Sequence, residues 1–244
     1  MPMNEFGKLV PHPLRSPREG VAVCAGDGRE GSTARRRYAE LCVTSNATFL
    51  TGASHPEEYV ARAVELGYEA VAITDLHTLG GVVRAHVAAK GLGEKCATRF
   101  VLGARVRATD LPGVDVCLYP TSMEAYRGLC RLLTVGKRRT TKGQCALTLQ
   151  DLREHCAGLL SVAICPDDLD ADRLTKHLRP LREIYDDDRL SLALCVRYRS
   201  DDLDRLDTLA EVAMREGIAI VASNDVHAHA PERQIGRASC RERV

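Results

Sequence analysis

Side chains that could bind a metal or carry charge stand where several predicted strands end. The clearest case is Asp225-Val226-His227, which follows the apolar run 218–222. Because side chains of an extended segment repeat every two residues, Asp225 and His227 point to the same side. A carboxylate beside an imidazole can hold a divalent metal, which accepts both oxygen and nitrogen ligands. The same residue types also form turns and helix caps, so the tripeptide alone is a weak signal.

The other predicted strand ends carry a mixed set of polar or ionisable side chains. These further candidates are Cys42, Thr44, Asp75, His77, Arg105, Cys165 and Asn224. The two thiols could ligate a soft metal, but a multi-metal phosphoesterase site also needs carboxylates and an activated water. We interpret His77 as a loop residue, because its spacing suggests no partner. The set therefore mixes possible metal ligands with residues that cannot serve as such.

The elements that must position these residues alternate between strand and helix from Tyr38 onward. Apolar runs predict strands over 38–43, 70–73, 100–106, 114–119, 159–164, 190–196 and 218–222. Amphipathic segments predict helices over 54–67, 81–90, 121–133, 149–156, 170–184 and 201–216. Such alternation predicts a mainly parallel sheet, open or closed into a barrel. In folds of this kind, functional residues gather at the carboxyl ends of the strands.

The first predicted helix has a start signal at Ser54-His-Pro-Glu57. The Ser54 hydroxyl can accept from the backbone N–H of Glu57, and the Glu57 carboxylate can reach back. Pro56 fits the first turn, where a missing N–H costs nothing, and Gly67 is expected to end the helix.

Charge and composition are those of an ordinary globular chain. Its 244 residues are 45% hydrophobic and carry a net charge of +1, from 34 basic and 33 acidic side chains. A domain that binds nucleic acid on its own usually has a basic excess, so the net charge gives no support for autonomous DNA binding. Basic residues cluster at Arg35-Arg36-Arg37 and Lys137-Arg138-Arg139, and we interpret both clusters as solvated surface or linker.

The ten cysteines are scattered, without a C-x-x-C pair. Several lie in apolar runs, as Cys117 and Cys195 do, which is typical of reduced core thiols. The N-terminus lacks the apolar region of a signal peptide, and no apolar run approaches the ~20 residues that span a bilayer. We therefore expect a cytoplasmic protein that does not contact membranes.

Seven segments, in order along the chain, are similar to the PHP (polymerase and histidinol phosphatase) domain of bacterial error-prone polymerases related to the replicative polymerase III alpha subunit. They are 38–46, 49–58, 66–75, 80–90, 129–134, Lys142-Gly-Gln-Cys145 and 222–233. The resemblance implies an α/β fold, a PHP-type distorted seven-stranded barrel over 38–234, at the front of a much longer polymerase. Residues 1–37 are expected to form a flexible tail. Residues 235–244 look like translated sequencing-adaptor sequence, and we expect them to be non-native.

Most of the metal ligands that the resemblance implies are replaced by other residues in this chain. Competent PHP domains open with His-x-His, where this chain has Cys42 and Thr44, and Thr-Asp-His has become Thr74-Asp75-Leu76. A family Glu aligns with Arg105, and a later His aligns with Cys165.

Of the family's ligands, Asp75, Asp225 and His227 remain as a degenerate remnant. Arg105 stays protonated, so we expect it to replace the cation's charge by pairing with Asp75 or Asp225. The incomplete ligand set predicts no residual zinc or manganese, and no other cofactor in this segment.

Three functions follow from these observations. The first is a segment of an error-prone DNA polymerase used in damage tolerance, whose missing core would transfer nucleotides with Mg²⁺. In that case this segment alone is inactive, its partner is the remainder of the polymerase, and it meets DNA only through the full-length enzyme. The second is a stand-alone, histidinol-phosphatase-like PHP phosphoesterase, which the missing His-x-His pair disfavours. The third is a metal-free module that contacts other replication or repair proteins.

Overall fold

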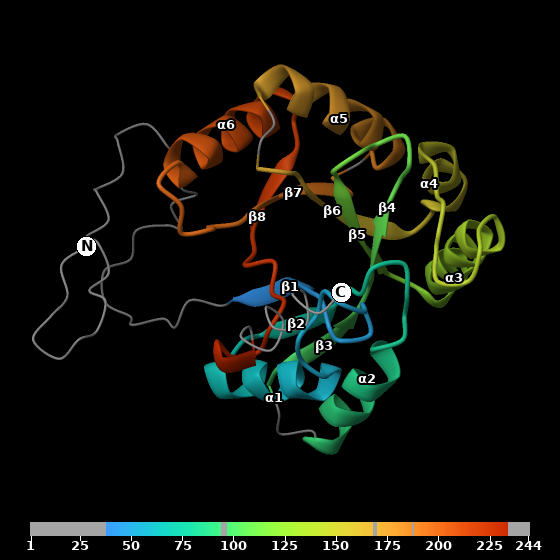
Figure 1. Ribbon diagram of the computed structural model, residues 1–244, viewed down its shortest axis with the longest axis vertical. Helices are drawn as coiled ribbons and strands as arrows, with labels where there is room; N and C mark the ends of the chain where they lie inside the picture. The colour runs from blue at the N-terminus through green and yellow to red at the C-terminus, as the bar shows by residue number, and fades with distance from the viewer. Residues whose placement is uncertain (1–37, 94–96, 168–169, 187, 234–244) are drawn as a thin grey trace, which may run out of the picture. The chain divides into compact units, whose positions relative to one another are not determined.

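The structure is a computed structural model that describes residues 38–93, 97–167, 170–186 and 188–233. The chain divides into Met1–Arg36 and Arg37–Val244, and the elements described below all belong to the second unit (Figure 1). The predicted tails, 1–37 and 235–244, lie outside the described residues.

The strands and helices follow the predicted alternation. The strands are β1 Ala39–Val43, β2 Ala70–Ile73, β3 Arg99–Leu102, β4 Ala104–Arg107, β5 Asp115–Pro120, β6 Leu159–Ile164, β7 Leu190–Leu194 and β8 Ala219–Ala222. The helices are α1 Pro56–Leu66, α2 Val82–Gly91, α3 Met123–Arg138, α4 Leu149–His155, α5 Ala171–Ile184 and α6 Asp202–Arg215. None of the helices in the described ranges is long and apolar enough to cross a membrane.

The strands form two sheets, β1-β2-β3 and β4-β5-β6-β7-β8. Pairing is parallel throughout the first sheet and between β6, β7 and β8. The mainly parallel prediction holds, except that β5 runs antiparallel to both of its neighbours. The segment 108–114 explains the antiparallel pairing with β4, because it is much shorter than the dozen or more residues of a parallel crossover.

The predicted strand 100–106 is divided between the two sheets at Gly103. A Cβ on Gly103 would lie 2.9 Å from Tyr119 Cδ1 and 3.0 Å from the Leu118 carbonyl oxygen, so only glycine lets the backbone pass this closely. If β3 and β4 count as one interrupted strand, the three- and five-stranded sheets together contain seven strands, as predicted. The sheets are linked by isolated bridges, Val43 to Val226 and Leu76 to Arg105. A continuously hydrogen-bonded barrel therefore stays a prediction.

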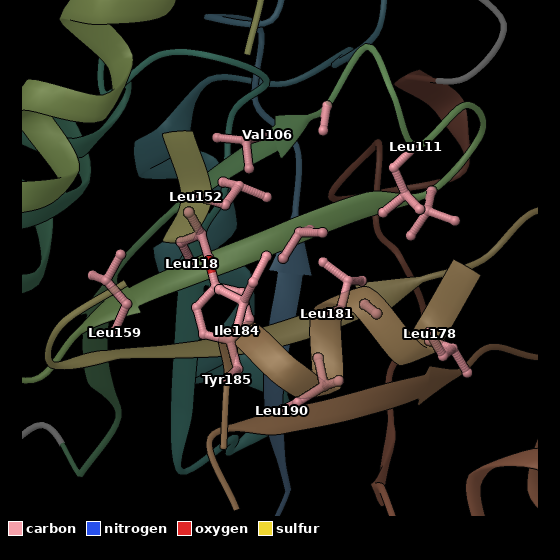
Figure 2. Close-up of a cluster of buried hydrophobic side chains, with 14 of the residues drawn as sticks. Val106, Leu111, Leu118, Leu152, Leu159, Leu178, Leu181, Ile184, Tyr185 and Leu190 are labelled. Carbon is pink, nitrogen blue, oxygen red and sulfur yellow. The ribbon is translucent and has the colours of Figure 1, made fainter. Parts of the chain in front are cut away.

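The largest hydrophobic core lies between the second sheet and the helices α3 to α6. Figure 2 shows part of it, including Leu118, Leu152 and Leu181. Its members include leucines with no exposed surface, among them Leu118, Leu159 and Leu181. Each such side chain contributes about 1.5–3 kcal/mol by leaving water. A second, smaller cluster combines Cys42, Cys117 and Cys195 with residues of both sheets. Within the described residues the cysteines are free thiols, in agreement with the sequence-based prediction.

The predicted start of α1 is wrong by one residue. The N-cap is His55, whose backbone N–H donates to the Glu58 carboxylate over 2.7 Å, and Pro56 is the first helical residue. Because proline is best tolerated at that first position, the cap falls on the residue before it. Ser54 is used in a tertiary contact instead, since its hydroxyl lies 2.8 Å from Nδ1 of His229. Gly67 ends α1 in a left-handed conformation, as predicted.

Candidate functional site

Backbone hydrogen bonds bring the predicted site residues together where strands of the two sheets end. The Thr44 N–H donates to the Val226 carbonyl, and the Val226 N–H donates to the Cys42 carbonyl, both over 2.8 Å. The Arg105 N–H donates to the Asp75 carbonyl over 3.0 Å. The carboxyl ends of β1, β2 and β8 therefore meet the start of β4, as expected for a site built at strand ends.

Arg105 lies at the centre of this site and is only 4% exposed. Its Nη2 lies 2.5 Å from Oδ1 of Asp225, and its Nη1 lies 3.5 Å from Oδ2 of Asp115. Burial alone would lower the pKa of Arg105, but Cys117, Asp225 and Asp115 together raise that pKa above its ordinary value. Arg105 therefore carries its positive charge inside the protein. Of the two pairings expected from the sequence, the one with Asp225 is present.

Asp225 is buried and engaged on both carboxylate oxygens. Oδ2 lies 3.1 Å from Nη2 of Arg197 and 3.6 Å from Nε2 of His227. Burial alone would raise the pKa of Asp225, but His227 and Arg105 outweigh it and hold that pKa well below its usual range. Asp225 also has a φ of 47°, in the left-handed region that few non-glycine residues occupy. Such strain persists only where surrounding contacts impose the conformation, and the ion pairs supply those contacts.

Arg197 is a site residue that the sequence analysis missed. It follows β7 on the segment 195–199, and its guanidinium is half-buried, 3.1 Å from Asp225 and 3.7 Å from Oδ1 of Asp167. A search for cations at every predicted strand end, rather than for metal ligands alone, could have found it.

Asp75 is buried but serves the adjoining turn rather than the Arg105 pair. Oδ1 accepts from the Ser45 N–H over 2.7 Å and from the Thr48 hydroxyl over 2.9 Å, while Oδ2 accepts from the Ser45 hydroxyl over 2.8 Å. Burial raises the pKa of Asp75, and these hydrogen bonds offset the rise only in part. Gly81 leaves room for the carboxylate, because a Cβ there would lie 2.5 Å from Oδ2. Asp75 thus holds the turn after β1 in place.

The substituted positions Cys42, Thr44 and Cys165 are all buried. Burial raises the pKa of Cys165 to about 12, so its sulfur stays a thiol at neutral pH. The hydrogen bond to Cys117, together with burial, raises the pKa of Cys42 as well. The Thr44 hydroxyl has no hydrogen-bond partner among the described residues. None of the three is poised as an anionic metal ligand.

A buried glutamate anchors the polypeptide just before Asp225, and sequence reasoning missed it as well. Glu40 Oε1 accepts from the Ser223 hydroxyl over 2.6 Å, and Oε2 accepts from the Asn224 N–H over 2.9 Å. Oε2 also accepts from the Tyr38 hydroxyl over 2.7 Å. This network ties β1 to the segment after β8 and so helps to place Asp225.

The donor set does not fit a metal centre. The oxygens of Asp225 face two guanidinium groups, and those of Asp75 accept from Ser45 and Thr48. The buried guanidinium of Arg105 lies against the Asp225 carboxylate, and its positive charge repels cations. Across the described ranges, no group of three or more His, Cys, Asp or Glu side chains is arranged to hold a metal ion.

Comparison with known proteins agrees with this architecture. A family model described as "PHP domain" matches residues 40–189. An error-prone DNA polymerase of Rhodopirellula baltica is 37% identical over 206 residues, which cover 81% of this chain and 17% of that protein. An error-prone DNA polymerase of Rhodopseudomonas palustris is 41% identical over 198 residues, covering 81% and 18%. The chain thus spans less than a fifth of the length of these relatives.

Two solved structures share the fold at low identity. A putative metal-dependent phosphoesterase from Bifidobacterium adolescentis has a TM-score of 0.55 and 15% identity, over 80% of this chain and 90% of that chain. An amidohydrolase from Chromobacterium violaceum has a TM-score of 0.56 and 18% identity, over 78% and 87%. With the profile match over 40–189, these findings show that the chain belongs to the PHP domain family and is homologous to part of the error-prone DNA polymerases.

Proposed function

We propose that this chain is the N-terminal PHP domain of an error-prone DNA polymerase that acts in damage tolerance and repair, and that its metal site has become a buried ion-pair cluster. The identity to error-prone polymerases over 81% of the chain supports the parent enzyme. The observation that carries the second part is the 2.5 Å contact between Arg105 and Asp225. It places a permanent cation on the carboxylate that a metal would need.

In our proposal this segment performs no metal-dependent hydrolysis, because the ion-pair cluster takes the place of a bound metal. A phosphoesterase of this type needs a bound metal to activate water, and the charge of Arg105 substitutes only for the electrostatic role of that metal. The guanidinium cannot lose a proton near neutral pH, so it supplies neither a base nor an activated water. The domain then serves as a rigid part of a cytoplasmic polymerase, whose Mg²⁺-dependent nucleotide transfer belongs to the remainder of the parent chain.

Metal analysis of the purified full chain tests the ion-pair proposal. The protein and an Asp225→Ala/His227→Ala variant are dialysed against Zn²⁺ or Mn²⁺, washed by gel filtration, and analysed by mass spectrometry. We expect equal and negligible metal in both proteins. One metal ion per chain in the unsubstituted protein, lost in the variant, would contradict the proposal and support a working site. Circular dichroism of both proteins controls for unfolding.

A hydrolysis assay separates this proposal from a stand-alone phosphoesterase. We expect no release of p-nitrophenol from p-nitrophenyl phosphate in Mn²⁺ or Zn²⁺ by the full chain. Hydrolysis that Asp225→Ala/His227→Ala abolishes would instead support the phosphoesterase function. The parent polymerase is tested on the source DNA, where the reading frame after Gln234 should continue into a polymerase core.

A further inference from the structure

A cavity of about 570 Å³ lies beside the segment that follows β2, apart from the Arg105–Asp225 pair. Three segments line it: 47–49 after β1, 76–78 after β2, and the stretch from the end of α3 into the loop before α4, 137–145. Neither Arg105 nor Asp225 is among its lining residues. Its volume falls within the range of small-ligand sites, roughly 300–1,000 Å³.

The charge of this cavity is positive and unmatched. Lys137 and Lys142 line it, and no Asp or Glu does. In the part of the chain that the structure describes, neither lysine forms an ion pair, whereas the neighbouring Arg107 pairs with Asp115 and Arg139 pairs with Asp151. Two unpaired ammonium groups facing a cavity without carboxylates favour an anionic ligand, and lysine commonly binds phosphate as a point charge.

The backbone around Lys142 is built to keep the loop close to α3. A Cβ on Gly136 would lie 2.6 Å from Cys145 Sγ and 2.7 Å from Leu147 Cδ2, so glycine is required for the loop to pack there. The Ala146 N–H donates to the Gly136 carbonyl over 3.0 Å. Gly143 has a φ of 91°, which only glycine adopts readily. Lys142-Gly-Gln-Cys145 therefore forms a defined turn that presents Lys142 beside the cavity.

His77 lines the same cavity and has one ring nitrogen that is not used within the described residues. Its Nε2 accepts from the Arg107 N–H over 3.0 Å, so the neutral ring carries its proton on Nδ1. Its backbone has a φ of 55° and is held by a hydrogen bond from the His77 N–H to the Arg105 carbonyl over 2.7 Å. Burial lowers the pKa of His77, so the ring is a neutral donor at neutral pH. A strained, well-held residue that lines a cavity is typical of binding sites.

The rim of the cavity carries an exposed aromatic ring. Phe49 lines the cavity and is 84% exposed, and the adjoining Leu50 is 52% exposed with a φ of 60°. Aromatic side chains next to cations are the usual platform for unstacked nucleic-acid bases, which bind by stacking with little sequence preference. Inorganic phosphate would use the lysines but leave Phe49 without a role.

We propose that this cavity binds a nucleoside phosphate of single-stranded DNA, with Lys137, Lys142 and His77 on the phosphate and Phe49 against the base. A duplex would not fit this arrangement, because its bases are stacked inside the helix and cannot reach Phe49. The proposal revises the expectations that the Lys137 cluster is merely solvated surface and that the chain meets DNA only within the full-length enzyme. It does not rest on the ion-pair proposal, since it concerns different residues.

The test is fluorescence anisotropy of 5′-fluorescein (dT)₁₂ titrated with the full chain in low salt. We expect Lys137→Glu/Lys142→Glu to weaken binding at least tenfold. The matched control is Lys90→Glu/Lys176→Glu, which makes the same change in net charge at exposed lysines. Lys90, like Lys137, lies in the last turn of a helix. The control should keep its affinity within about twofold.

Phe49→Ala tests the base contact and should weaken binding by about tenfold, since it removes the ring against which the base stacks. Melting temperatures of all variants are compared, so that loss of binding is separated from unfolding. Displacement of the probe by dTMP, sensitive to the same substitutions, would support the site, because dTMP carries the same phosphate and base. Displacement by inorganic phosphate at equal strength, with Phe49→Ala unchanged, would overturn the base contact. Equal loss in both lysine double variants, or none in either, would overturn the site.

Discussion

The cations around Asp225 meet carboxylates, whereas Lys137 and Lys142 beside the cavity of about 570 Å³ meet none among the described residues. In the first region Arg105 and Arg197 converge on one buried carboxylate. In the second, Lys137 and Lys142 face an open cavity without acidic groups. Buried charges are tolerated only when paired, while exposed charges can stay unpaired at little cost. The buried arginines are thus neutralised by a carboxylate of the protein itself, whereas the exposed lysines remain free to bind an anionic ligand.

Removal of the central carboxylate should give the largest effect on stability. Asp225→Ala leaves Arg105 buried beside a second arginine, so we expect the free energy of unfolding to fall by about 3–5 kcal/mol. Urea denaturation followed by circular dichroism measures the change. Glu65→Ala is the matched control, because it removes the carboxylate of an exposed ion pair with Arg62. It should change the free energy of unfolding by less than about 1 kcal/mol. Equal losses in the two variants would show that burial does not distinguish these pairs.

Asp75→Ala should give an intermediate effect. The substitution removes the acceptor of three hydrogen bonds from Ser45 and Thr48, and it leaves buried donors unpaired. We expect a loss of about 1–3 kcal/mol in the free energy of unfolding. A Ser45→Ala/Asp75→Ala double variant should lose less than the sum of the two single variants, because the two residues share hydrogen bonds. Strict additivity would argue against this coupling.

The pH dependence of stability should separate Asp225 from ordinary surface carboxylates. Because the pKa of Asp225 is lower in the folded than in the unfolded chain, its contribution is present above about pH 4 and is lost as the pH falls. Urea midpoints between pH 3 and 6 should therefore fall more steeply for the unsubstituted protein than for Asp225→Asn. The difference in slope cannot exceed about 1.4 kcal/mol per pH unit for one group. Parallel curves would contradict the low folded-state pKa.

Removal of the unmatched cations should give the smallest effect on stability. Lys137→Ala/Lys142→Ala deletes two exposed charges without a carboxylate partner among the described residues, so we expect the free energy of unfolding to change by less than about 0.5 kcal/mol. The measurement is the same urea titration. A loss as large as that of Asp75→Ala would mean that these lysines support the fold, and the contrast between the two regions would fail.

Residue pattern alone predicted most of the fold, because each strand and helix has its own periodicity. β6 was predicted with its observed bounds, Leu159–Ile164. The direction of β5 was not foreseen, since it depends on how short the connection 108–114 is rather than on any apolar pattern. The start of α1 was misplaced because Ser54 bonds His229, which lies far away in the sequence.

Sequence analysis predicted only those site residues that align with site positions of the PHP family. Arg105 and Asp225 were identified because they stand at recognisable strand ends, and their pairing follows from opposite charge. Arg197 and Glu40 were missed, since their partners are set by tertiary packing that sequence spacing does not reveal. Lys137 was assigned to ordinary surface, because a local run of basic residues does not show which of them lacks a carboxylate neighbour.

The Arg105–Asp225 pair also makes position 105 a costly place to introduce a metal ligand. The resemblance to competent PHP domains implies a metal site with a carboxylate at position 105 and histidines at positions 42, 44 and 76. Replacing Arg105 by Glu as a first step would set a new negative charge beside Asp225 and Asp115, in a buried site that holds no metal to balance it. This first substitution alone would therefore destabilise the buried cluster, so position 105 tolerates a metal ligand only if a bound cation arrives with it.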